Sequence, residues 1–81
     1  MRVHVSSVDF DKTFAIHTHK LDTVAALKER ICKKIGSLAE EQVLSFEGAL
    51  LEDEKCLFEY EIQHHSTLSL RFQHRQYAIN N

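Results

Sequence analysis

The sequence predicts an α+β domain in which a small mixed β-sheet packs against a single α-helix. Two observations carry this prediction. Several short segments alternate apolar and polar residues with a period of two, and one longer segment repeats its apolar residues every three or four positions. Neither a β-hairpin nor an amphipathic helix can bury its apolar face alone, so the sheet and the helix are expected to cover each other.

The chain is expected to begin with a β-hairpin. Residues 2–8 and 13–18 both alternate in the manner of half-buried strands, and the Asp-Phe-Asp-Lys segment at 9–12 supplies turn-forming residues between them. The inward-facing residues of this hairpin are Val3, Val5, Phe14 and Ile16. The opposite face of its first strand carries Arg2, His4, Ser6 and Val8.

One long helix is predicted after Asp22 and Thr23, which both suit the N-cap position. Basic residues crowd its later turns, where the carbonyl end of the helix dipole favours positive charge. Gly36 can adopt the left-handed conformation of a C-terminal cap, so the helix should end near residue 35. Its apolar stripe consists of Val24, Leu27, Ile31 and Ile35.

Three further strands follow the helix. Apolar and polar residues alternate over residues 42–46 and again over residues 67–72, as in half-buried strands. Between them, Glu47-Gly48 is expected to form a tight turn, and residues 49–51 a short strand that returns from it. The inward-facing residues of these strands are Leu44, Phe46, Leu68, Leu70 and Phe72. A loop or short 3₁₀ turn between the last two strands carries Leu57, Tyr60 and Ile62.

The length and composition favour one domain that binds proteins. Eighty-one residues suit a single domain, which we assign to residues 1–73, and residues 74–81 show no periodicity and are expected to form a flexible C-terminal tail. A net charge of −2 argues against nucleic-acid or membrane-surface binding. We expect a monomer in the cytoplasm, the nucleus or both, because no apolar run suits a membrane span or signal peptide and the two cysteines are far apart.

Several stretches of the chain resemble ubiquitin and its relatives, over residues 1 to about 73. The resemblance implies the β-grasp fold, which is a five-stranded mixed sheet packed on one helix, and it implies no catalytic activity and no cofactor. The stretches that carry it are Asp22-Thr23-Val24, Leu44-Ser45-Phe46-Glu47-Gly48, Leu51-Glu52-Asp53 and the run from Tyr60 to Leu70.

The sequence departs from this family at the reactive end. Conjugated family members carry Gly-Gly where this chain has Gln76 and Tyr77, so the chain as given is expected not to be conjugated. We therefore expect a noncovalent protein-interaction module with signalling partners in the ubiquitin and proteasome pathway. An alternative stays open: the chain is the N-terminal ubiquitin-like part of a modifier or larger fusion protein whose Gly-Gly or effector region lies beyond Asn81.

The recognition surface implied by the resemblance has also changed. The family's apolar patch matches Val8, Ser45, Ser69 and Arg71, of which Val8 alone is apolar. Replacing a central aliphatic by serine removes a contact of the kind that dominates small interfaces, so ordinary ubiquitin receptors should bind weakly or not at all. Ala49 and His64 stand where ubiquitin has chain-forming lysines, whereas Lys12, Lys28 and Lys34 match lysines of the family. The predicted protein-binding residues are His4, Val8, Ser45, Ala49, Ser69 and Arg71.

Metal and thiol chemistry form a weaker third hypothesis. His17 and His19 have a spacing that suits a shared metal on a strand, but no third ligand lies near them in the sequence, and the adjacent His64 and His65 are expected to point apart. No activating base is signalled for either cysteine, so neither a metal site nor catalysis is predicted. The remaining expectation is conformational: Glu47 and Glu54 replace small residues of the family and should be slightly strained if their φ is positive.

Overall fold

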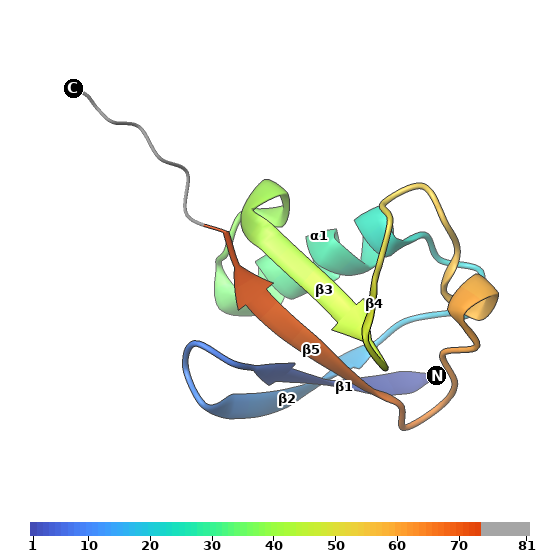
Figure 1. The fold of residues 1–81 in the computed structure, drawn as a ribbon, viewed down its shortest axis with the longest axis horizontal. Coiled ribbons are helices and arrows are strands. Elements are labelled where there is room, and N and C mark those ends of the chain that lie inside the picture. Colours follow the sequence, from blue (N-terminus) through green and yellow to red (C-terminus); the bar gives the residue numbers. More distant parts are fainter. Residues whose placement is uncertain (74–81) are drawn as a thin grey trace.

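The computed structural model describes residues 1–73, which form a five-stranded mixed sheet with one helix lying across its inner face (Figure 1). The predicted fold class is confirmed. The predicted tail, residues 74–81, lies outside the described residues. The elements are β1 (Arg2–Ser7), β2 (Lys12–His17), α1 (Val24–Ile35), the 3₁₀ helix η1 (Ala39–Glu41), β3 (Gln42–Phe46), β4 (Ala49–Leu50), the 3₁₀ helix η2 (Leu57–Tyr60) and β5 (Thr67–Phe72).

The last strand lies at the centre of the sheet. The strand order is β2-β1-β5-β3-β4, so β5 runs between the first strand and the third. It pairs in parallel with β1 and antiparallel with β3. A parallel partner requires a long crossover connection, which here includes α1. The alternation in the sequence predicted which face each strand buries, and the structure adds which strands are neighbours.

The core forms between the helix and the inner face of the sheet. Its fully buried side chains come from every layer: Val3, Val5, Val24, Leu27, Ile31, Leu44, Leu57, Leu68 and Leu70. Ile35 was predicted to continue the apolar stripe of the helix. This prediction is wrong, because the Ile35 side chain is 38% exposed. It is the last helical residue, and with Phe10 and Phe14 it borders an open groove instead of the core.

The ends of α1 follow from specific side chains. Thr23 is the N-cap, and its Oγ1 accepts a hydrogen bond from the Ala26 N–H at 3.1 Å. Asp22 has a different role, because its carboxylate accepts from the Thr18 hydroxyl at 2.7 Å. Gly36 caps the other end with a φ of 82°, and its N–H donates to the Cys32 carbonyl.

Two turns test the expectation about strained glutamates. Glu47 has a φ of 50° and Gly48 one of 86°, which together make the two-residue type I′ turn between β3 and β4. The condition for strain is not met at Glu54, which does not adopt a positive φ. Glu54 lies in a turn closed by the Lys55 N–H and the Glu52 carbonyl, and this turn keeps ordinary backbone angles.

Candidate protein-binding face

The sheet presents a mostly polar surface on the side away from α1. Successive side chains of a strand point to opposite faces. Because the alternate residues of β1, β3 and β5 are buried under the helix, the residues between them point outward. We call this surface the outer face, and it comprises His4, Ser6, Val43, Ser45, Thr67, Ser69 and Arg71.

Three serines form a row across the centre of the outer face. Ser6 of β1 lies directly opposite Ser69 of β5, and Ser69 lies directly opposite Ser45 of β3. Cross-strand neighbours of this kind have Cβ atoms about 5 Å apart. The serine row, defined as Ser6, Ser69 and Ser45, therefore places three hydroxyl groups side by side, each able to donate and accept hydrogen bonds.

Arg71 stands beside the serine row and is exposed. It lies opposite Val43 on β3, one step along β5 from Ser69 on the same face. Arg71 forms no ion pair with any residue among 1–73. Its guanidinium offers several N–H donors in a planar fork that matches a carboxylate.

The structure brings together most of the residues predicted from the sequence. Val8 follows β1 directly, is 61% exposed and donates its N–H to the Leu70 carbonyl, which fixes the hairpin turn beside β5. His4 lies at the opposite end of the face and pairs with Thr67. Ser45, Ser69 and Arg71 share the face with them, as described above.

Ala49 is placed differently from the other predicted residues. It pairs with Phe46, which packs against the core, and not with a residue of the outer face, although Ala49 itself is exposed. Leu50 pairs with Ser45 and therefore extends the outer face onto β4, where it is 68% exposed. The sequence prediction omitted Leu50, although the period of two in the returning strand could have identified it.

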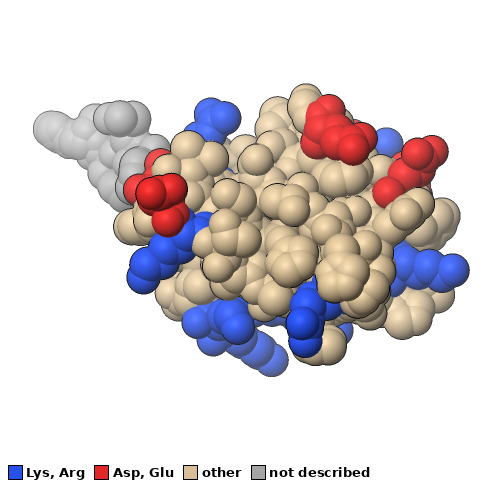
Figure 2. Space-filling model, turned by 90° about the horizontal axis from the view of Figure 1, so that it is seen from below, with Lys and Arg blue, Asp and Glu red and all other residues tan. Residues whose placement is uncertain are grey.

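Charged residues lie around the molecule's periphery. In the view onto the β1 and β2 side, Lys and Arg lie at several places around the border, Asp and Glu lie at the left and upper right, and the middle is uncharged (Figure 2). Two ion pairs link the basic helix to acidic residues: Lys28 to Asp53 at 2.8 Å and Arg30 to Asp22 at 3.2 Å. The Lys28 side chain is only 11% exposed, so of the three family lysines it is the one withdrawn from solvent.

The histidines and cysteines were the basis of the weaker metal and thiol hypothesis. Within residues 1–73, no group of three or more His, Cys, Asp and Glu is arranged to hold a metal ion. His64 and His65 were expected to point apart, and this is wrong: their ring centroids are 3.9 Å apart. The reason is that His65 has a left-handed φ of 74°, which removes the strand-like alternation on which the expectation rested. Cys32 and Cys56 are free and partly buried.

The described residues contain no helix long and apolar enough to cross a membrane.

The comparison with known families assigns the chain to one of them. A model of the ubiquitin family matches residues 3–75, which is most of the chain. Domains of this family generally act as protein-interaction or modifier modules and are generally not enzymes. The match agrees with the β-grasp arrangement of five mixed strands on one helix, and the chain therefore belongs to the ubiquitin family.

Proposed function

We propose that this domain is a noncovalent protein-interaction module that binds its partner through the outer face. The observation that supports the proposal best is the strand register, which aligns the serine row and sets Arg71 beside it. Of the other predicted residues, His4 lies at one end of this surface and Val8 borders it at the other end. Ala49 is not part of it, and Leu50 takes its place next to Ser45.

The chemistry of the outer face selects a polar, acidic partner segment. A carboxylate of the partner can accept two N–H donors from Arg71, and the serine hydroxyls can pair with its backbone or side chains. An apolar receptor helix fits poorly, because covering Arg71 without a counter-charge costs several kcal/mol. The exposed Leu50 supplies an apolar contact at the margin.

We further propose that the 81-residue chain is not conjugated. Gln76 and Tyr77 stand where conjugated relatives have Gly-Gly, and both side chains obstruct the narrow channels that receive such a terminus. Incubation with a ubiquitin-activating enzyme and ATP should yield no thioester, and a thioester would contradict this part. The module should act as a monomer with partners of the ubiquitin and proteasome pathway, in the cytoplasm or nucleus.

Site-specific photocrosslinking in cells tests the location of the binding surface. A photoreactive amino acid at Ser69 should give a discrete adduct with a partner protein, and the additional change Arg71→Glu should remove that adduct. The same photoreactive group at Glu54, an exposed loop residue, is the matched control and should give none. Equal adducts from both positions, or an adduct from Ser69 that survives Arg71→Glu, would contradict the proposal.

A further inference from the structure

The turn before β5 is fastened to β1 by hydrogen bonds on both sides. The His65 N–H donates to the Arg2 carbonyl at 2.7 Å, and the His4 N–H donates to the Ser66 carbonyl at 2.8 Å. The Arg2 N–H donates to His64 Nδ1 at 2.9 Å. Inside the turn, the Ser66 N–H donates to the Gln63 carbonyl. The backbone positions of His4 and His65 are therefore fixed relative to one another.

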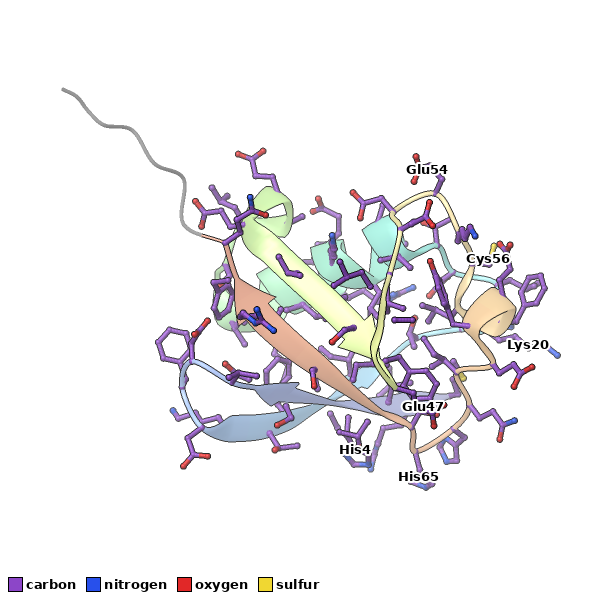
Figure 3. All side chains as sticks on the ribbon, in the orientation of Figure 1. His4, Lys20, Glu47, Glu54, Cys56 and His65 are labelled. Atoms are coloured by element: carbon purple, nitrogen blue, oxygen red, sulfur yellow. The ribbon has the colours of Figure 1, made fainter. Side chains whose placement is uncertain are left out.

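His65 reaches its neighbour through an unfavourable backbone conformation. Its φ of 74° lies in the left-handed region, which is uncommon for residues other than glycine, although histidine adopts it more often than most. In this conformation the His65 ring lies against that of His4, with the centroids 5.6 Å apart and the planes inclined by 17°. Figure 3 shows the labelled side chains of His4 and His65 close together beside the turn that precedes β5.

The facing nitrogens have the spacing of two ligands on a tetrahedral metal ion. His65 Nδ1 and His4 Nε2 are 3.4 Å apart, a distance that also allows a hydrogen bond when one ring nitrogen is protonated and the other is not. Two imidazole nitrogens bound to zinc at about 2.05 Å, with a bond angle of about 109°, are separated by about 3.3 Å. A square-planar ion would need them closer, at about 2.9 Å. We propose that His4 and His65 form a two-histidine site for Zn²⁺, with water in the remaining coordination positions.

Neighbouring groups are compatible with this two-ligand site. His64 does not act as a third ligand through Nδ1, because that nitrogen already accepts the Arg2 N–H. The N-terminal ammonium is held by the Thr18 carbonyl at 2.7 Å. Because Arg2 and this ammonium are nearby positive charges, the site should have modest affinity.

Zinc titration of the isolated chain tests the site without any partner, so its outcome is independent of the proposed docking function. Titration calorimetry with ZnCl₂ should show one ion per chain. Long-range ¹H–¹⁵N spectra should show the largest changes at His4 Nε2 and His65 Nδ1. Even the loss of a group that merely orients a ligand costs about tenfold in affinity, so His4→Gln and His65→Asn should each weaken binding by at least that factor.

The variants are chosen so that a loss of fold does not obscure the result. Asparagine tolerates a left-handed φ, so His65→Asn should fold at least as well as the parent. His17→Gln is the matched control, because His17 is an exposed histidine of β2 and should leave zinc binding unchanged. Absence of binding at millimolar ZnCl₂, unchanged affinity in both folded site variants, or an equal loss in His17→Gln would each overturn the proposal.

Discussion

Glu47 illustrates how a single residue can oppose the turn in which it lies. The type I′ turn requires positive φ at both central positions, and Gly48 accepts this readily whereas Glu47 does not. We expect Glu47→Asn to raise the free energy of unfolding by about 1 kcal/mol, because asparagine tolerates the left-handed region. Urea unfolding measures the change. Glu54→Asn is the matched control and should have little effect, since Glu54 lacks a positive φ; equal gains in both variants would refute this explanation.

Asp22 links the loop before α1 to the helix through its charge. A hydrogen bond from Thr18 is the main cause that lowers the pKa of Asp22, with further contributions from the His19 N–H and Arg30, against an opposing effect of burial. Because the folded pKa is lower than the unfolded one, the stabilisation is present above about pH 3.9 and is lost as the pH falls through the folded pKa.

Asp22→Asn should therefore lower the free energy of unfolding by about 1–2 kcal/mol at neutral pH. The difference from the parent should shrink as the pH falls below the folded pKa, where the parent's carboxyl is also neutral. Thermal unfolding across the acid range measures this. Glu40→Gln, at an exposed residue of η1, should show no such trend. A difference for Asp22→Asn that stays constant with pH would contradict the charge argument.

At the scale of elements, the N-cap of α1 is the clearest local determinant of the fold. Thr23 satisfies the Ala26 N–H with its hydroxyl, so Thr23→Ala should cost about 1 kcal/mol of stability. Thr23→Ser keeps the hydroxyl and should retain most of the stability that the N-cap contributes. Chemical denaturation of the three proteins checks this order, and equal destabilisation by alanine and serine would show that the hydroxyl is not the cause.

The element boundaries were predictable where a local signal marks them. Gly36 ends the helix at residue 35 as predicted, and Glu47-Gly48 makes the expected turn. The sequence did not indicate η1, because residues 39–41 contain no apolar periodicity. The sequence also did not predict the backbone conformation of His65. No sequence signal marks a left-handed histidine, and this conformation accompanies the hydrogen bond from the His65 N–H to β1.

At the scale of the whole molecule, strand order and register determine the candidate surface. Period-two alternation predicts the face on which Ser45 or Ser69 lies, but neighbours across a sheet depend on which strands pair. The family resemblance supplied that information for most of the predicted residues. It did not identify Leu50, which the two-residue strand β4 puts opposite Ser45, whereas Ala49 pairs with Phe46.

The central claim is that a polar outer face has replaced an apolar docking surface. An ¹⁵N-labelled chain titrated with an apolar helix from a ubiquitin receptor tests this most directly. For the parent, the account predicts either no amide shifts or small shifts that do not approach saturation. The double variant Ser45→Ile with Arg71→Val should gain binding, with shifts on β3 and β5. Tight binding by the parent centred on Ser45, or no gain in a folded double variant, would contradict the account.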